Sequence, residues 1–251
     1  KINLDLKEFC NLVKQNANLQ NSFSDKNWKK KIYHLKNSQI EDMPSHKSSY
    51  IQPKEVMKKL FNIIILQKTV VVTGVGCHQH WAARHLPFKP KNNLFLSSGG
   101  HGTMGYDLPS AIGASMTLNN FRVFCIVGDG SLLMNIQELA SLSERNLDVK
   151  IILMNNNRLG IVSQFQKITW GEDPSTGYFN TPDFVSIANG FSIKAKKITN
   201  PSEINTGIDW INSFTGPGLL EIVIDKDADV VPMLMSGQPM NSMWMGRGVK
   251  E

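Results

Sequence analysis

Two polar tips that follow consecutive apolar runs constrain the fold of this chain more than any other feature. The run Val123–Val127 leads into the first tip, the Gly-Asp-Gly-Ser sequence of Gly128–Ser131. The run Ile151–Met154 leads into the second tip, Asn155–Asn156. The intervening stretch Leu132–Arg145 has the apolar spacing of a helix. Two strands joined by a crossover helix pair in parallel, so their carboxyl ends emerge at the same edge of a sheet. We therefore expect the two tips to lie side by side.

The chemistry of these tips indicates a site for a metal ion and an anionic ligand. The Asp129 carboxylate and an asparagine amide oxygen are the hard oxygen ligands that Mg²⁺ takes. Ser131 is predicted to be the N-cap of the following helix. The free N–H groups and the positive dipole end of such a helix favour an anion. Together they predict a metal diphosphate site.

Strand-like and helix-like segments alternate along most of the chain. The expected strands are Thr69–Thr73, Leu94–Leu96, Val123–Val127, Ile151–Met154, Ser192–Lys194 and Leu219–Ile224. The expected helices are Glu55–Asn62, Trp81–His85, Leu108–Met116, Leu132–Arg145, Asp183–Ala188 and Ser202–Ser213. This alternation predicts an α/β fold, a doubly wound parallel sheet with helices on both faces, whose ligands bind outside the strand carboxyl ends.

The motifs at that edge carry a family resemblance. The tips Gly128–Ser131 and Asn155–Asn156 resemble the thiamine diphosphate signature of the 2-oxo-acid decarboxylases and carboligases. Longer stretches are similar to the C-terminal domain of acetolactate (acetohydroxyacid) synthase large subunits: Ser97–Gly105, Met134–Leu139 and Asn155–Gly160.

The resemblance implies how the cofactor is held. Asp129 and Asn156 would ligate Mg²⁺ through their side chains, and Arg158 would ligate it through its backbone carbonyl. His78 would contact the diphosphate, from a loop in which Cys77 stands where the family has glutamine. The remaining residues predicted around the cofactor are Gly102, Met104, Gly130, Ser131 and Gly160.

Two further roles follow from the resemblance. Backbone groups of Gly102 and Met104 would bind the aminopyrimidine, and the Met104 side chain would hold the cofactor bent. Phe165 aligns with a tryptophan that lines the acceptor pocket of the relatives. If Phe165 lines this pocket, it leaves more room there and removes the indole N–H donor.

No catalytic residue is expected within this chain. In the family, an activating glutamate lies on the pyrimidine-binding domain of a partner subunit, and no segment here resembles that domain. The full enzyme is expected to be a homodimer or tetramer that decarboxylates pyruvate and condenses the two-carbon unit with a second 2-oxo acid, a step of branched-chain amino acid biosynthesis. FAD and a regulatory small subunit are further candidates.

The same resemblance divides the chain into four parts. Residues 1–14 match the end of a preceding central domain, 15–50 a linker, and 51–230 the thiamine diphosphate-binding domain. Residues 231–251 form a Met-rich tail that is either an active-site lid or a disordered terminus. We expect a fragment of a larger enzyme; the alternative is an N-terminal arm on a complete protein.

Composition excludes several other classes. The net charge of +6 includes one dense basic run, Lys29–Lys31, without interleaved aromatics, which indicates a solvated helix face rather than a nucleic-acid site. Apolar runs are of strand length and no signal pattern precedes the chain, so a cytoplasmic protein is expected. The three cysteines form no disulfide framework.

Three rival interpretations remain open. His78, His80 and His85 raise the alternative of a zinc site, although their spacing is unusual for one. A related decarboxylase, or a carboligase with another acceptor such as a keto-sugar, would share the cofactor site. A non-catalytic nucleotide-binding domain would share only the fold.

Overall fold

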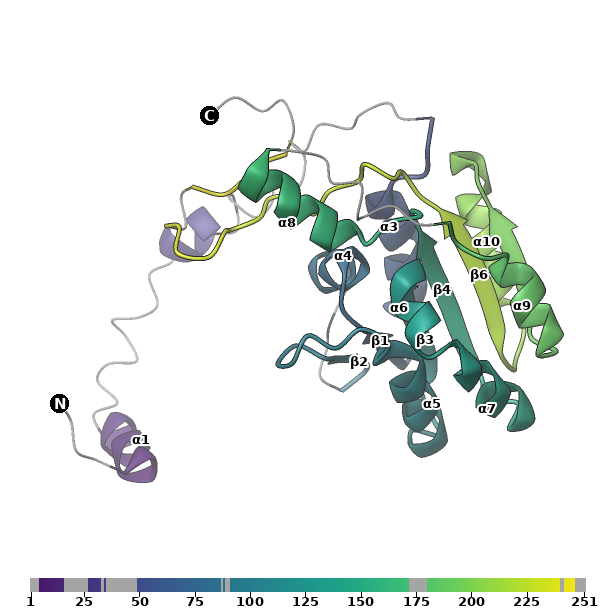
Figure 1. The fold of residues 1–251 in the computed structure, drawn as a ribbon. Helices are drawn as coiled ribbons and strands as arrows, with labels where there is room; N and C mark the ends of the chain where they lie inside the picture. The colour runs from purple at the N-terminus through teal and green to yellow at the C-terminus, as the bar shows by residue number, and fades with distance from the viewer. Residues whose placement is uncertain are drawn as a thin grey trace. The chain divides into compact units, whose positions relative to one another are not determined.

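The computed structural model describes residues 5–15, 27–32, 34, 49–86, 88, 91–171, 180–239 and 242–246. The chain divides into two compact units, Lys1–Lys47 and Ser48–Glu251. In the first unit, α1 (Leu6–Gln15) and residues 27–32 are helical (Figure 1). The second unit carries the predicted site.

The second unit is built on a six-stranded parallel sheet with the order β2-β1-β3-β4-β6-β5 (Figure 1). Its strands are β1 (Thr69–Thr73), β2 (Asn93–Ser97), β3 (Arg122–Gly128), β4 (Val149–Asn155), β5 (Lys194–Ile198) and β6 (Gly218–Val223). Every residue of β1 and β4 is buried, as expected for central parallel strands that are covered on both faces.

One predicted strand, Ser192–Lys194, was wrong in position. Ser192 adopts a φ of 59° in the turn that precedes the strand, and β5 begins only at Lys194. This strand lies at the sheet edge and reads Lys-Ala-Lys-Lys-Ile. Lysines protect an edge strand from further pairing, and they also remove the apolar run by which a strand is recognised. The other five predicted strands are confirmed to within a residue or two at each end.

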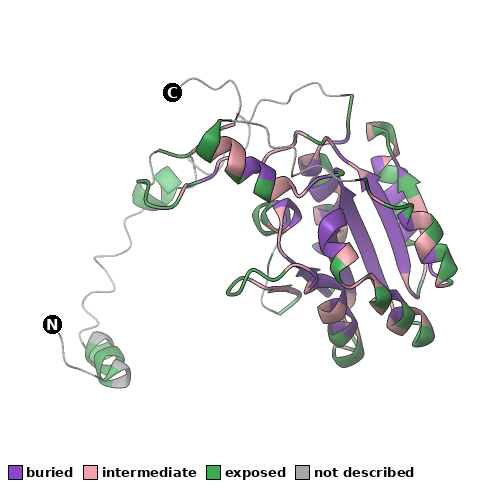
Figure 2. Ribbon diagram, in the orientation of Figure 1, coloured by how far each residue is buried: buried purple, intermediate pink, exposed green. Residues whose placement is uncertain are grey.

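Helices cover both faces of the sheet. One face carries α3 (Pro53–Ile64), α4 (Cys77–His85) and α10 (Ile204–Asn212), whose apolar side chains share a core cluster with Val71 and Phe124. The other face carries α5 (Asp107–Thr117), α6 (Asp129–Met134), α7 (Leu139–Glu144) and α9 (Phe184–Gly190), which pack with Val70 and Cys125. Figure 2 shows the buried sheet between these two layers. The doubly wound α/β fold is confirmed.

The helix predicted over Leu132–Arg145 is interrupted. It is divided into α6, the 3-10 turn η2 (Ile136–Glu138) and α7, with a break at Asn135. The Asn135 amide donates a hydrogen bond of 2.8 Å to the carbonyl of Gly105, so this side chain is engaged with the loop before α5. Asparagine offers such alternatives to the helical ladder, which is why it often ends a helix.

Helix α8 (Gly160–Trp170) was not predicted, because its fully buried positions are polar, while Ile161 and Ile168 pack against the core only partly buried. Its buried side chains are the polar Ser163 and Gln164. The Gln164 amide pairs with both backbone groups of Val230, at 2.8 Å each. Its exposed side chains include large apolar groups: Val162, Phe165 and Trp170. Among the described residues, no helix has the length and apolar character needed to cross a membrane.

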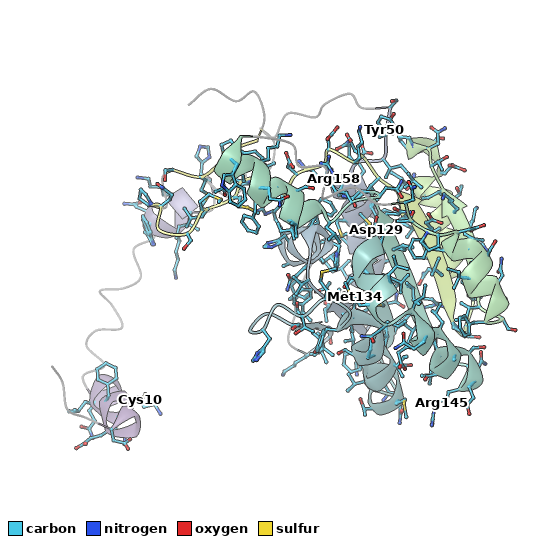
Figure 3. All side chains as sticks on the ribbon, viewed as in Figure 1. Cys10, Tyr50, Asp129, Met134, Arg145 and Arg158 are labelled. Atoms are coloured by element: carbon cyan, nitrogen blue, oxygen red, sulfur yellow. The ribbon has the colours of Figure 1, made fainter. Side chains whose placement is uncertain are left out.

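The winding of the sheet reverses between β1 and β3. These strands are neighbours, yet α4 follows β1 onto one face and α6 follows β3 onto the other. The two connections therefore diverge and leave a crevice at the carboxyl edge, which is where open α/β sheets bind ligands. Asp129 and Arg158 lie near each other at this edge, whereas Arg145 lies at the opposite end (Figure 3).

The packing of β6 against α10 gives a test of the core. A Cβ atom on Gly218 would come within 2.7 Å of Phe214 Cζ and 2.8 Å of Ile211 Cδ1. We expect Gly218→Ala to destabilise the chain by about 1–3 kcal/mol, the usual cost of overpacking. Gly113, inside α5, has open space around its Cα, so Gly113→Ala should be neutral or stabilise by up to about 1 kcal/mol. Denaturant unfolding of both variants checks this contrast, which equal effects would contradict.

Candidate functional site

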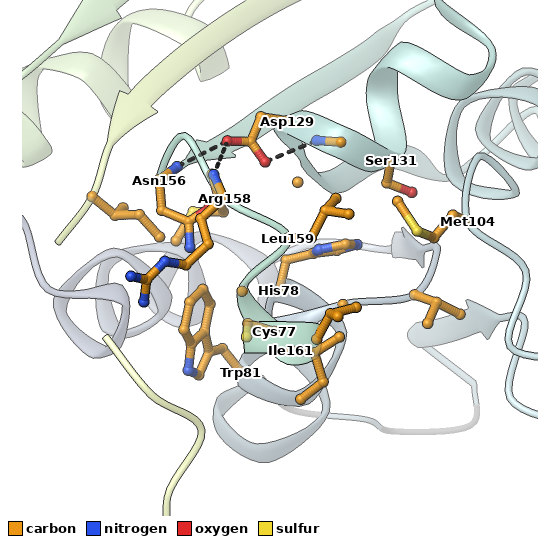
Figure 4. Close-up of a pocket in the computed structure, with 18 residues that line it drawn as sticks. Cys77, His78, Trp81, Met104, Asp129, Ser131, Asn156, Arg158, Leu159 and Ile161 are labelled. Carbon is orange, nitrogen blue, oxygen red and sulfur yellow. Dashed lines mark hydrogen bonds between the residues drawn. The ribbon is translucent and has the colours of Figure 1, made fainter. Parts of the chain in front are cut away.

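A pocket that is open to solvent lies at the reversal of the winding (Figure 4). The segments that follow β1, β3 and β4, which include the starts of α4, α6 and α8, line most of it. The structure gathers most of the predicted site residues around this pocket: Cys77, His78, Met104, Asp129, Gly130, Ser131, Asn156, Arg158 and Gly160.

The Asp129 carboxylate joins the two tips. One oxygen, Oδ2, accepts the N–H groups of Asn156 at 3.2 Å and Arg158 at 3.3 Å, and Oδ1 accepts that of Gly130 at 2.8 Å (Figure 4). Burial raises the pKa of Asp129 to about 6, and these backbone hydrogen bonds oppose the rise. The predicted meeting of the tips is confirmed, since β3 and β4 pair in parallel with Gly128 opposite Met154.

A buried polar network supports the second tip from behind. The Asn155 amide nitrogen donates to Glu221 Oε1 at 2.8 Å, and its oxygen accepts the N–H of Asn157 at 3.0 Å. Glu221 is fully buried in β6 and also receives Lys197 at 2.9 Å. Asn157 has a φ of 52°, a conformation that asparagine tolerates better than most residues. The network therefore holds the chain bend on which Asn156 sits.

Sequence reasoning missed Glu221 and Asn155 as supporting residues. The signal was a glutamate within the apolar strand Gly-Leu-Leu-Glu-Ile-Val, where an unpaired charge would be costly. Arg158 is similarly buried, and its guanidinium lies 3.6 Å from Asp227.

The prediction that Ser131 is an N-cap was wrong. Helix α6 already begins at Asp129, after Gly128 as N-cap, so Ser131 lies within the first turn. The hydroxyl of Ser131 donates to Asp107 Oδ2 at 2.6 Å and accepts the N–H of Gly105 at 2.9 Å. These bonds tie α6 to the start of α5, and Asp107 is another supporting residue that the sequence did not single out.

His78 is a buried, neutral imidazole on the wall of the pocket. Burial lowers its pKa to about 3, and His80 adds a smaller contribution. Its Nε2 has no hydrogen-bond partner, and its Nδ1 faces the positions that Cβ atoms would take on Gly76 and Gly128, each 2.9 Å away. Nε2 lies 3.8 Å from Asp107 Oδ2, whereas the absence of side chains on Gly76 and Gly128 leaves room for a ligand near Nδ1.

Cys77 lies beside the second tip as a protonated thiol. Burial raises its pKa to about 12, with smaller contributions from Asp229 and Asp129. A thiol with this pKa supplies neither a thiolate ligand nor a nucleophile at neutral pH. A Cβ atom on Gly160 would lie 3.1 Å from its sulfur and 2.9 Å from the Asn156 amide nitrogen. The absence of a side chain on Gly160 thus lets the start of α8 lie close to Cys77 and Asn156.

Two predicted site residues lie outside the pocket wall. Gly102 has a φ of 67° in a loop with open space around it, and its N–H bonds to the Ser98 carbonyl at 3.1 Å. Phe165 is 44% exposed on α8. Their roles toward the aminopyrimidine and the acceptor stay predictions.

The residues present fit a hydrated Mg²⁺ better than zinc. A carboxylate, an amide oxygen and a backbone carbonyl from the two tips are hard oxygen donors. The described part of the chain contains no group of three or more His, Cys, Asp or Glu side chains placed to hold a metal ion. The alternative zinc site from His78, His80 and His85 therefore has no structural support.

Comparison with known proteins agrees with this geometry. Residues 74–222 match the family described as thiamine pyrophosphate enzyme, C-terminal TPP binding domain. The chain belongs to this family. Thiamine pyrophosphate is thiamine diphosphate, so the matched part of the chain is a thiamine diphosphate-binding domain. The matched range contains all three segments that line most of the pocket.

The chain is also similar to curated acetolactate synthases. It is 34% identical over 249 residues to an acetolactate synthase large subunit of Cyanidium caldarium, a match that covers 98% of this chain and 41% of the relative. It is 40% identical over 176 residues to acetolactate synthase isozyme 2 large subunit of Escherichia coli (strain K12), covering 69% and 32%. It is 40% identical over 184 residues to acetolactate synthase 1, chloroplastic, of Oryza sativa subsp. japonica, covering 70% and 28%. The chain thus spans less than half the length of these relatives.

The close approach at Gly160 predicts a variant that disturbs the second tip without removing a polar side chain. Gly160→Ala should displace the Asn156 amide, which is a predicted metal ligand, and weaken Mg²⁺-dependent thiamine diphosphate binding about 10–100-fold. Gly190→Ala, at an open position in α9, is the matched control and should bind like the wild type. Calorimetric titration measures both. Wild-type affinity in Gly160→Ala would place the Asn156 amide outside the binding site.

Proposed function

We propose that this chain is the diphosphate-binding part of an acetolactate synthase-like carboligase. The observation that supports it most is the meeting of Asp129 with the Asn156 loop at the reversal of the sheet, within a family of thiamine pyrophosphate enzymes. The similarity to acetolactate synthases extends over 98% of the chain in one relative. The assembled enzyme would decarboxylate pyruvate and join the two-carbon unit to a second 2-oxo acid.

The pocket residues would divide the binding of cofactor and metal between them. Asp129 and Asn156 would ligate Mg²⁺ with their side chains and Arg158 with its carbonyl, and the first turn of α6 would offer N–H groups to the diphosphate. Met104, on the same wall, would support the cofactor beyond its diphosphate. When bound, thiamine diphosphate supplies the electron sink for decarboxylation of a 2-oxo acid.

The protein's own contribution here is binding and orientation. Asp129 holds the second tip through two N–H groups, and the Glu221–Asn155 pair holds it from behind. Both supports are buried, so the metal ligands are held by a rigid second layer rather than by a mobile loop.

We infer that the remaining parts of the catalytic site come from elsewhere in the assembly. The activating glutamate would lie on a pyrimidine-binding domain of a partner subunit, in a homodimer or tetramer. The same proposal includes the four-part division of the chain, with the Met-rich tail as a lid over the active site. It also includes FAD in the full-length enzyme and a regulatory small subunit. A decarboxylase, or a carboligase with another acceptor, would use the same pocket and differ only in these parts.

The metal assignment predicts a loss of cofactor binding in two variants. Asp129→Ala and Asn156→Ala should each reduce Mg²⁺-dependent thiamine diphosphate affinity by at least about 100-fold, because each removes an oxygen ligand. Asp129→Ala should also lower the melting temperature, since it leaves buried N–H groups of Asn156 and Arg158 unsatisfied. Asn156→Ala should melt like the wild type, which separates ligand loss from misfolding.

A distant carboxylate provides the control for charge. Asp209 is exposed on α10, in a surface ion pair with Lys59, and Asp209→Ala should bind the cofactor like the wild type. Calorimetry with and without MgCl₂ measures the affinities. Unchanged affinity in Asn156→Ala would refute the assignment of Asn156 as a metal ligand. If the wild-type protein does not bind thiamine diphosphate, the result would favour a non-catalytic domain.

Phe165 provides a test of acceptor choice. If Phe165 borders the acceptor, Phe165→Trp should restore bulk and an indole donor, and shift the preference between 2-oxobutyrate and pyruvate by about 10-fold or more, since small apolar differences are worth about 1–3 kcal/mol. Competition between the two acceptors in the enzyme assembled with its pyrimidine-binding domain measures the product ratio. Trp170→Phe, on the same exposed helix, is the control. An unchanged ratio in Phe165→Trp would place Phe165 outside the acceptor site.

A further inference from the structure

A fully buried carboxylate lies behind the diphosphate end of the pocket. Asp107, the first residue of α5, has no exposed surface. Its Oδ1 accepts the N–H of Leu108 at 3.1 Å, and its Oδ2 accepts the Ser131 hydroxyl at 2.6 Å. The ring nitrogen Nε2 of His78 lies 3.8 Å from the same Oδ2. Two pocket side chains, Ser131 and His78, therefore face one carboxylate that is not itself part of the pocket wall.

The chain makes room for this carboxylate. A Cβ atom on Gly74, at the end of β1, would lie only 2.0 Å from Asp107 Oδ2. Burial raises the pKa of Asp107, and the hydrogen bond from Ser131 opposes that rise most among the bonds that do so. An aspartate at the first position of a helix is also favoured by the helix dipole. Asp107 is thus held as an acceptor, surrounded by donors.

The bond to Asp107 decides what Ser131 can offer to a ligand. A hydroxyl has one proton and two lone pairs. The Ser131 proton is donated to Asp107, and one lone pair accepts the Gly105 N–H at 2.9 Å. Ser131 therefore faces the pocket as an acceptor, which suits the waters of a hydrated Mg²⁺ and not a phosphate oxygen.

The same carboxylate decides where the proton of His78 resides. A neutral imidazole carries one proton, on either Nδ1 or Nε2. The distance of 3.8 Å from Nε2 to Asp107 is too long for a hydrogen bond, but a lone pair on Nε2 would lie close to a negative charge inside the protein. The proton is more stable on Nε2. Nδ1, which faces Gly76 and Gly128, then carries the lone pair.

We propose that Asp107 is a positioning residue that decides which groups donate and which accept hydrogen bonds in the part of the pocket lined by Ser131 and His78. Asp107 takes the Ser131 proton and holds the His78 proton on Nε2. The consequence of this arrangement is that Ser131 and His78 accept hydrogen bonds from metal-bound water. This consequence rests on the proposed function. The diphosphate oxygens are left to the metal and to backbone N–H groups. This differs from the role in which His78 donates to the diphosphate.

The tautomer can be measured without cofactor. Two-bond ¹H–¹⁵N spectra of the chain carrying ¹⁵N-histidine, with His78→Gln to assign the signals, should show His78 protonated on Nε2. In Asp107→Asn, which keeps the shape and removes the charge, the Nδ1-protonated form should become populated. A wild-type ring protonated on Nδ1, or a ring unchanged in Asp107→Asn, would overturn the proposal. The wild-type spectrum decides the matter even if Asp107→Asn does not fold.

The shared hydrogen bond can be tested by affinity. Asp107→Asn and Ser131→Ala should each weaken Mg²⁺–thiamine diphosphate binding about 10-fold, and the double variant should lose no more than the larger single loss. Additive losses, or tighter binding in Asp107→Asn, would overturn the proposal. Asp183→Asn, at the exposed N-cap of α9, should be silent alone and additive with Ser131→Ala. Wild-type protein that does not bind the cofactor would refute the proposed function and leave the tautomer measurement standing.

Discussion

The hydrogen bonds between Asp129 and the backbone of Asn156 and Arg158 are the contact on which the rest of the site depends. They join the ends of two neighbouring parallel strands, and they fix the direction in which the second loop leaves the sheet. The contact is costly, because burial raises the pKa of Asp129 to about 6 and the backbone N–H groups offset only part of that cost. A carboxylate held in this way is stabilised further by a nearby cation. The fold therefore keeps a buried carboxylate in the pocket of this thiamine pyrophosphate-binding domain.

Polar groups that never reach the pocket keep its wall in place. Asp107 joins α5 to α6 through Ser131, and Glu221 supports the bend at Asn155. Each is fully buried within or beside the core. Such groups weaken a core unless they are paired, so their value lies in orientation rather than in stability. Both stand one layer behind residues that line the pocket.

Helix α8 connects the site to the segment that leads into the C-terminal tail. It begins at Gly160, where the loop approaches Cys77, and its Gln164 pairs with the backbone of Val230. Arg84 of α4 donates to the carbonyls of Val231 and Pro232. The beginning of the tail is thus held by two helices that also border the pocket.

The sequence by itself determined the fold and the chemistry of the two tips. Central parallel strands are buried on both faces, so they appear as unbroken apolar runs such as Val123–Val127, and the polar residues after them must lie at one edge. Periodicity could not reveal α8, whose fully buried positions are polar, or β5, whose edge position replaces apolar residues with lysines. Only the tertiary structure showed that Ser131 faces Asp107 and that Glu221 supports Asn155, because these partners come from strands and helices distant in the chain. The local sequence pattern shows only what a residue's own helix or strand requires. The pairing of buried polar groups depends on which helices and strands the fold brings together.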